Sequence, residues 1–284
     1  MTTRLRESTA DRISNLPDGA IERILVFLPI KDAAKTSLLS RDWRHRWRSI
    51  PQLVFDDRFA PLPEEDDCGN IADDGKDVVL KIYEALLTHD GLLTKFELSI
   101  PEFRRQIPLD LLILHLSRKA VQELALLFED DNYPKLHSSL FSPAFPLKRL
   151  KLKGSFVKDN SDMVDLFASL PALQHLNLGI ELLLLDDSDE HPPSKVIGSL
   201  QKLLEAEDQL GFCCLQHLEE VNIHDSRGMQ VELDLVRFVL ATAPVLRRIN
   251  IQRKEKLSSK KALKFLNEMI VYKRISKEAE IKYV

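Results

Sequence analysis

The chain has 284 residues, and its 40 Lys and Arg against 44 Asp and Glu give a formal net charge of −4 at pH 7. This near balance argues against a dedicated nucleic-acid-binding protein, whose binding domain would be strongly basic. The nine Gly include neither of the glycine-rich phosphate-binding motifs, and the three Cys form no CxxC metal pair. Because no apolar run is long enough for a signal peptide or a membrane span, we expect an intracellular protein of the nucleus or cytoplasm.

Residues 11–52 form a basic segment that carries both tryptophans of the chain. Its first apolar residues follow the i, i+3, i+4, i+7 spacing of an amphipathic helix of about two turns: Ile21, Ile24, Leu25 and Leu28. Pro29 ends this helix, and Asp32 can cap a further helical element that includes Trp43 and Trp47. A unit of about 40 residues rarely builds a stable core alone. The tryptophans therefore either pack against the rest of the chain or anchor a partner protein.

The rest of the chain is rich in leucine, with 49 in the whole sequence, and repeats the pattern apolar-x-x-apolar-x-apolar. The copies are Leu93-Phe96-Leu98, Val121-Leu124-Leu126, Leu147-Leu150-Leu152, Leu173-Leu176-Leu178, Leu218-Val221-Ile223 and Leu246-Ile249-Ile251, with a weaker copy at Ile50-Leu53-Phe55. Two longer gaps hold an acidic insert at 56–77 and a second insert around 182–195. Without them the period is about 26–28 residues, which lies in the range of leucine-rich repeats.

Each repeat predicts a strand followed by a helix. The last two apolar residues of the pattern lie on one face of a strand, and the residue between them faces solvent. These solvent-facing positions include five polar residues, which we take as a candidate binding strip: Glu97, Lys151, Asn177, Asn222 and Asn250. Helical spacing follows at 78–87, 109–116, 163–170 and 235–239. Strands joined through helices are parallel, so we expect an α/β fold built as a leucine-rich-repeat solenoid, with strands on its concave face and helices on its convex face. It should be irregular, because the usual turn Asn is absent.

No catalytic or metal-binding constellation is present in the sequence. The eight His form neither HxxxH nor HExxH, and there is no GxSxG motif. We therefore expect no cofactor, no metal and no enzymatic activity. Basic residues gather around the tryptophans and between 247 and 264. These are either solvated faces, a nuclear-localisation signal or contacts for an acidic partner.

The order of residues in the basic segment closely resembles the F-box of plant F-box proteins. The matching positions are Leu16-Pro17, Ile24-Leu25, Leu28-Pro29, Lys31-Asp32-Ala33, Thr36-Ser37, Leu39-Ser40, Trp43 and Trp47. Residues 231–252, followed by a Lys-rich helix and the closing strand AEIKYV, resemble the FBD region of the same proteins. The resemblance implies an F-box at 8–52, irregular repeats at 53–210, and an FBD-like region at 211–284 that continues and caps the repeats.

Members of this family are non-catalytic substrate receptors of Skp–cullin–F-box ubiquitin ligases. The resemblance implies a module of three helices that binds a Skp-type adaptor, and through it a cullin. Nine residues would form or support this surface: Leu16, Pro17, Ile24, Leu28, Pro29, Leu38, Leu39, Trp43 and Trp47. The repeats would bind the target protein, with no nucleic-acid or membrane partner. The alternative is a leucine-rich-repeat protein-binding module that acts outside a ubiquitin ligase.

Overall fold

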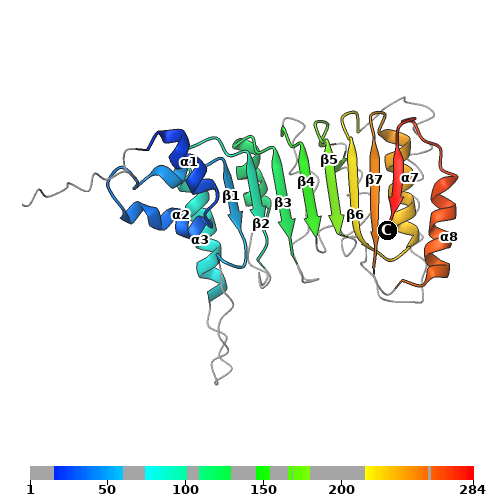
Figure 1. Cartoon of the computed structure of the whole chain (residues 1–284), viewed down its shortest axis with the longest axis horizontal. Helices are drawn as coiled ribbons and strands as arrows, with labels where there is room; N and C mark the ends of the chain where they lie inside the picture. The colour runs from blue at the N-terminus through cyan, green and yellow to red at the C-terminus, as the bar shows by residue number, and fades with distance from the viewer. Residues whose placement is uncertain are drawn as a thin grey trace, which may run out of the picture.

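The computed structural model describes residues 16–59, 74–100, 109–128, 145–153, 166–167, 169–179, 215–254 and 257–284. Within these ranges a small helical module at the N-terminal end precedes a long sheet (Figure 1). Most of the acidic insert, the whole second insert and all three Cys lie outside the described residues. No helix among those described is both long and apolar enough to cross a bilayer.

The sheet has eight strands in chain order, and every neighbouring pair is parallel. The strands are β1 Gln52–Phe55, β2 Lys95–Leu98, β3 Glu123–Leu127, β4 Arg149–Lys153, β5 His175–Gly179, β6 Glu220–Ser226, β7 Arg248–Arg253 and β8 Glu280–Tyr283. Each repeat found in the sequence supplies one strand, as predicted, and the closing strand forms β8. The expected parallel α/β arrangement is thus confirmed.

Two rows of apolar residues cross the sheet and form its core. The first row pairs Leu53, Phe96, Leu124, Leu150, Leu176, Val221, Ile249 and Ile281 in register, and the second pairs Phe55, Leu98, Leu126, Leu152, Leu178, Ile223, Ile251 and Tyr283. All but the two β8 residues are buried. Burial of one such side chain stabilises the fold by about 1.5–3 kcal/mol.

Helices are described between β1 and β2, β2 and β3, β6 and β7, and β7 and β8, and in Figure 1 α7 lies behind β8. The helices of this part are α3 Asp74–Thr88, α4 Leu109–Arg118, α7 Gln230–Thr242 and α8 Ser259–Ile270. Helix α4 buries Leu109, Leu112, Ile113 and Leu116, the i, i+3, i+4, i+7 face that the sequence predicted. Of the helix expected at 163–170, only 166–167 is described as helical. One face of the sheet therefore packs on helices, and the opposite face is open.

The N-terminal module contains two α-helices and two short 3-10 helices. They are α1 Asp18–Val26, α2 Ile30–Lys35, η1 Thr36–Leu38 and η2 Arg46–Ser49. Where a module of three helices was expected, the described residues thus form two α-helices followed by two 3-10 helices. Hydroxyl side chains bond to the backbone here, with Thr36 Oγ1 donating to Ala33 O at 2.6 Å and Ser37 Oγ to Arg44 O at 2.9 Å. Such bonds favour turns over a continued α-helix.

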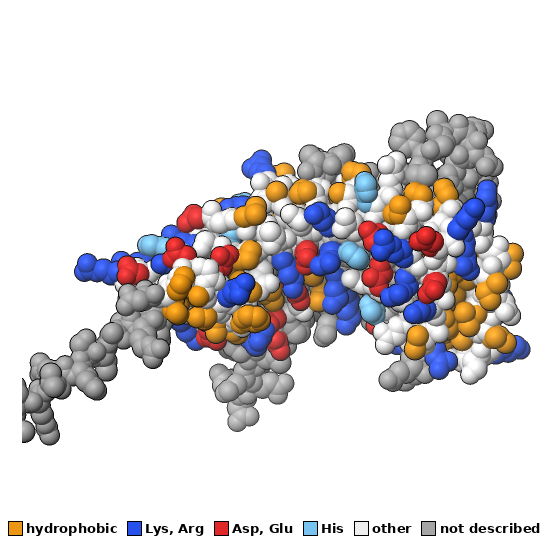
Figure 2. Space-filling view, turned by 45° about the horizontal axis from the view of Figure 1, so that its top comes forward, with side chains coloured by type: hydrophobic (Ala, Val, Ile, Leu, Met, Phe, Trp, Pro, Cys, Tyr) orange, Lys and Arg blue, Asp and Glu red, His pale blue; other side chains and the backbone are white. Residues whose placement is uncertain are grey.

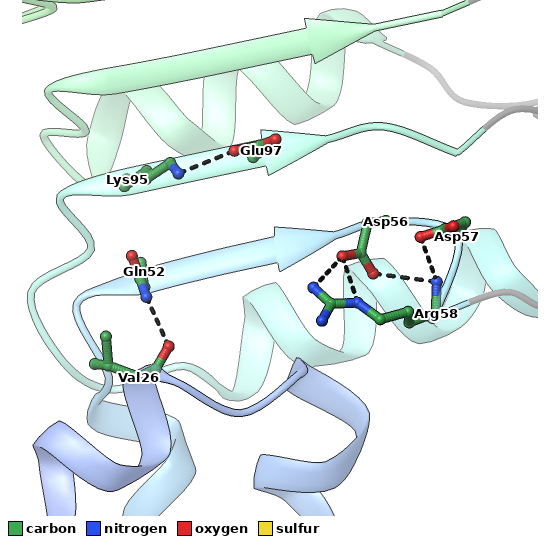
Figure 3. A network of polar contacts seen from close by, with 7 residues as sticks. All are labelled: Val26, Gln52, Asp56, Asp57, Arg58, Lys95 and Glu97. Carbon is green, nitrogen blue, oxygen red and sulfur yellow. Dashed lines mark hydrogen bonds and ion pairs between the residues drawn. The ribbon is translucent and has the colours of Figure 1, made fainter.

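The module is fixed to the start of the sheet by hydrogen bonds. Gln52 of β1 donates through Nε2 to the carbonyl oxygen of Val26 at 2.8 Å (Figure 3). His89, buried after α3, donates through Nε2 to Ile50 O at 2.8 Å, and burial lowers the pKa of its imidazole. The backbone N–H groups of Asp90 and Gly91 donate to Arg48 O. Module and sheet thus share one packed junction.

A buried glutamate at the start of α7 accepts hydrogen bonds from the loop that connects β6 with α7. The carboxylate of Glu232 accepts bonds from Ser226 Oγ at 2.6 Å, Arg227 N at 2.9 Å and Gly228 N at 3.1 Å. Gly228 has a φ of +64°, a conformation that favours glycine. Burial raises the pKa of Glu232, although these bonds oppose the shift.

Replacing Gly91 by Ala tests the junction. A Cβ at Gly91 would lie 2.7 Å from Ser49 Cα, so the backbone of the junction must move. We expect Gly91→Ala to lower the free energy of unfolding by about 1–3 kcal/mol in urea titrations. The control is Gly19→Ala in α1, where nothing lies within 4 Å of the new Cβ. That variant should be unchanged or stabilised by up to about 1 kcal/mol. Equal behaviour of the two variants would contradict the described junction.

Stability measured against pH tests the buried glutamate. The raised pKa of Glu232 means that its contribution is fully present below the unfolded value, near 4.5, and is lost as pH rises through the folded pKa. The unfolding free energy of the wild type minus that of Glu232→Gln should therefore be largest below pH 4.5. It should become smaller once the pH exceeds the raised pKa of Glu232 in the folded chain. Denaturant titrations at several pH values measure this difference, and a growing gap with rising pH would refute the assignment.

Candidate functional site

The N-terminal module presents large apolar side chains to solvent. Phe27 and Leu38 are each 87% exposed, Leu39 is 64% exposed and Ile24 is 43% exposed. We call these four residues the exposed apolar set. Figure 2 shows hydrophobic side chains gathered over this end of the molecule. Exposed apolar groups of this size on a small module are typical of a protein-interaction site.

The elements of the module hold this set outward because other residues bury inward. Ile21 and Leu25 of α1 and Ala33 of α2 are buried, so Ile24 and the chain after α1 face away from the core. Pro17 and Pro29 precede the two helices, and each carbonyl oxygen accepts two N–H groups of the first turn. An ion pair between Arg46 and Asp18 joins η2 to the start of α1.

The nine residues predicted for the adaptor surface fall into three classes. Ile24, Leu38, Leu39 and Pro17 are exposed, and Leu16, Leu28, Pro29 and Trp47 are half-buried. Leu16, Leu28 and Trp47 pack against the core. Trp43 is only 3% exposed and belongs to the core, so it can support a partner surface but offers no contact of its own. Which of these residues contact a partner stays a prediction.

Phe27 belongs to the exposed apolar set, although the sequence reasoning missed it. It follows α1 directly, in the run Val26-Phe27-Leu28-Pro29, which resembles core sequence. Its position in the sequence could have revealed its exposure, because Phe27 lies outside the i, i+3, i+4, i+7 spacing of the apolar helix face. An aromatic residue outside that stripe cannot share its burial.

The five residues of the candidate strip do lie in one row on the open face of the sheet. Glu97 pairs with Ala125, Ala125 with Lys151, Lys151 with Asn177, Asn177 with Asn222, and Asn222 with Asn250. The amide of Asn250 donates through Nδ2 to Asn222 Oδ1 at 2.7 Å. At the β2 end, Lys95 Nζ lies 2.9 Å from Glu97 Oε2 (Figure 3). Binding of a target protein by this row stays a prediction.

A second row on the same face carries acidic and basic residues, which alternate except at the neighbours Arg149 and His175. Lys95, Glu123, Arg149, His175, Glu220, Arg248 and Glu280 pair strand by strand. Arg149 and Glu123 form an ion pair at 2.8 Å, and His175 lies 3.6 Å from Glu220. Opposite charges on adjacent strands attract, so the pair of Arg149 with Glu123 supports the register.

A hollow lies on the open face, beside the strip at the C-terminal ends of β4 to β7. It encloses about 270 Å³ and is lined by Lys151, Leu152, Lys153, Asn177, Gly179, His224, Asp225 and Gln252. Lys151 and Asn177 are the two lining residues that belong to the candidate strip. In the described part of the chain, the hollow included, no three His, Cys, Asp or Glu residues come together as a metal site.

Comparison with known proteins finds two domain families in the chain. The F-box domain model matches residues 13–54, and the FBD model matches residues 213–251. An F-box/FBD/LRR-repeat protein of Arabidopsis thaliana is 39% identical over 116 residues, which is 41% of this chain and 27% of that protein. A second such Arabidopsis protein is 34% identical over 146 residues, 50% of this chain and 32% of that protein. An Arabidopsis F-box/LRR-repeat protein is 53% identical over 55 residues, 19% of this chain and 11% of that protein. The matches thus span a third or less of these relatives.

Substitutions in the module separate core from surface. We expect Trp43→Ala to lower the unfolding free energy by about 3–5 kcal/mol, because it leaves a cavity under the helices. Leu38→Ala should change it by less than about 0.5 kcal/mol, since this side chain is exposed. Chemical denaturation of the two variants measures both values. If Leu38→Ala is destabilised and Trp43→Ala is not, the assignment of Trp43 to the core and Leu38 to the surface is wrong.

Proposed function

We propose that this chain, which belongs to the plant F-box/FBD/LRR-repeat family, is a substrate-recognition subunit of a Skp–cullin–F-box ubiquitin ligase. F-box proteins of this family generally act in such ligases, and the F-box domain generally binds a Skp-type adaptor. The observation that carries the proposal is the exposed apolar set, which lies inside the matched F-box segment.

The adaptor surface follows from this set. Ile24, Phe27, Leu38 and Leu39 would insert into an apolar groove of the adaptor, while Leu16, Pro17, Leu28, Pro29 and Trp47 shape the rim and Trp43 holds the module together from inside. In such interfaces a few well-packed apolar anchors carry most of the binding free energy. The cullin would be reached through the adaptor, in the nucleus or cytoplasm.

The mechanism is proximity rather than chemistry. A target bound to the sheet would be held near the ubiquitin-conjugating enzyme that the same assembly carries, which raises the effective concentration of its lysines. We assign target binding to the open face, with its strip Glu97, Lys151, Asn177, Asn222 and Asn250. The eight parallel strands in chain order, with helices described between the first three and the last three of them, support a leucine-rich-repeat solenoid, in which such an open face is the extended binding surface.

A charge placed in the exposed apolar set tests adaptor binding. We expect Leu38→Glu to weaken binding to a recombinant plant Skp-type adaptor by about 2–4 kcal/mol, because a carboxylate would be desolvated in an apolar groove. Titration calorimetry with the purified full chain measures the loss. Leu111→Glu on α4 is the matched control, since Leu111 is 58% exposed and lies outside the module.

Co-purification of partner proteins with the full chain discriminates the two candidate functions. Co-purification of both adaptor and cullin supports the ligase receptor. Adaptor without cullin supports a binding module that acts outside a ligase. Equal adaptor binding by Leu38→Glu and the wild type would remove the assigned surface.

A further inference from the structure

We propose that the C-terminal end of this chain is a docking surface for a membrane that carries anionic lipids. The surface consists of helix α8 and the residues that follow it to 284, and we call it the α8 surface. It lies at the end of the molecule opposite to the N-terminal module, where α8 is the outermost helix (Figure 1). The inference goes beyond the proposed receptor function and does not depend on adaptor binding. It departs from the resemblance, which implied no membrane partner.

Helix α8 has a wide apolar side, and the fold buries only part of it. Ala262, Phe265 and Met269 are buried, and the ring of Phe265 lies 5.7 Å from that of Tyr283 in β8. Four aliphatic side chains on α8 and in the turn after it are exposed, by 82% for Val271: Leu263, Ile270, Val271 and Ile275. Figure 2 shows hydrophobic side chains gathered at this end of the molecule, with Lys and Arg around them. Such exposure on an outer helix favours contact with an apolar partner or medium.

The same end of the chain concentrates positive charge. Residues 247–284 contain 12 Lys and Arg against 4 Asp and Glu, which gives a formal net charge of +8. The other 246 residues contain 28 Lys and Arg against 40 Asp and Glu and carry −12. Two copies of this chain that met through their C-terminal ends would therefore repel each other. The charge favours an anionic partner over a second copy.

Most of the basic side chains on the α8 surface are not neutralised by acidic neighbours. Lys264 is paired with Glu268 at 3.8 Å. The other acidic residues of 257–284 are Glu278 and Glu280, which are exposed and have no ion pair among the described residues. Six exposed basic residues in this range likewise form no ion pair there: Lys260, Lys261, Lys273, Arg274, Lys277 and Lys282. Four positive charges thus remain in excess.

The preference for lysine favours a lipid surface over an acidic protein. Protein–protein interfaces are enriched in Arg and aromatic residues and depleted in Lys. Six of the seven basic residues between 257 and 284 are Lys. The one Arg of this range, Arg274, already donates through Nη1 to the carbonyl oxygen of Ala279 at 2.9 Å. A lysine carries a mobile point charge on a long apolar stem, so it can reach lipid headgroups while aliphatic neighbours contact the apolar layer beneath.

The positions of these residues on α8 suit a planar anionic surface. Lys260 lies three residues before Leu263, so the two side chains are neighbours on the helix. Glu268, the acidic residue of α8, lies five residues after Leu263 and therefore on another side of the helix. The cytoplasmic leaflet of a membrane presents anionic headgroups above an apolar interior. An amphipathic helix that offers both basic and apolar groups binds such an interface.

Co-sedimentation of the purified full chain with lipid vesicles tests the inference. Vesicles of phosphatidylcholine are compared with vesicles in which about a third of the lipid is phosphatidylserine. We expect binding to the anionic vesicles to be about tenfold tighter, and to weaken as salt is added. Lys260→Gln and Lys273→Gln should each weaken this binding by about fivefold, the effect of one basic residue near the surface. Val271→Ser should weaken it by about threefold or more, because it removes apolar area.

Three variants are matched controls that should bind the anionic vesicles as tightly as the wild type. Lys148→Gln removes an exposed lysine just before β4, and Leu80→Ser removes an exposed leucine of α3. Leu38→Glu changes the exposed apolar set of the N-terminal module, so it separates the two ends of the molecule. Thermal melting checks that each variant is folded.

Several results would overturn the inference. Two of them are equal binding to neutral and anionic vesicles, and equal losses in Lys148→Gln and Lys260→Gln. Binding to immobilised polyglutamate without binding to anionic vesicles would assign the α8 surface to an acidic protein instead. A mass of twice the 32.6 kDa of one chain in light scattering, reduced by Val271→Ser, would assign it to a second copy.

Adaptor binding is measured in the same preparations, so that the two claims fail separately. A chain that binds adaptor but not anionic vesicles refutes the membrane surface alone. A chain that binds anionic vesicles through Lys260 and Val271 but does not bind adaptor supports the membrane surface and refutes the receptor function alone.

Discussion

The register of the eight parallel strands is the constraint on which the rest of the structure depends. Side chains alternate between the two faces of a strand, so a slip of one residue would bury the polar strip and expose the apolar rows. One alignment of β4 with β5 therefore sets both the core pair Leu150–Leu176 and the surface pair Lys151–Asn177. The ion pair of Arg149 with Glu123 reinforces it from the open face. Core and candidate binding surface are thus set by the same backbone pairing.

The N-terminal module depends on this sheet for its orientation. Its own core is small, with Ile21, Leu25, Ala33 and Trp43 as its main members. The bonds from Gln52 and His89 attach it to the first strands and to the end of α3. Because the attachment is made of packed and hydrogen-bonded groups rather than a linker, the exposed apolar set keeps a fixed direction relative to the open face of the sheet. The proposed receptor function needs such a fixed geometry, because a target is brought near an enzyme only if its direction is set.

Much of this arrangement could be predicted from the sequence, because period-2 and helical spacing report directly on burial. The strands around Leu150 and Leu176, the helix face of Leu112 and the row of strip residues all followed from spacing. Spacing could not place Trp43, because a large aromatic residue in a short segment serves a core or a partner equally well. It could not find the hollow, because that depends on how side chains from four strands lie together and on the bulge at Asp225. Nor could it foresee the 3-10 helices, which arise from local hydroxyl bonds that periodicity ignores.

The central claim is that the N-terminal module, and not the sheet, receives the adaptor. Amide hydrogen exchange of the full chain, with and without a recombinant Skp-type adaptor, tests it most directly. The account predicts slower exchange in peptides covering 24–39, where the exposed apolar set lies, and unchanged exchange in β3 to β7. Slower exchange confined to the strands, with no change in the module, would contradict it.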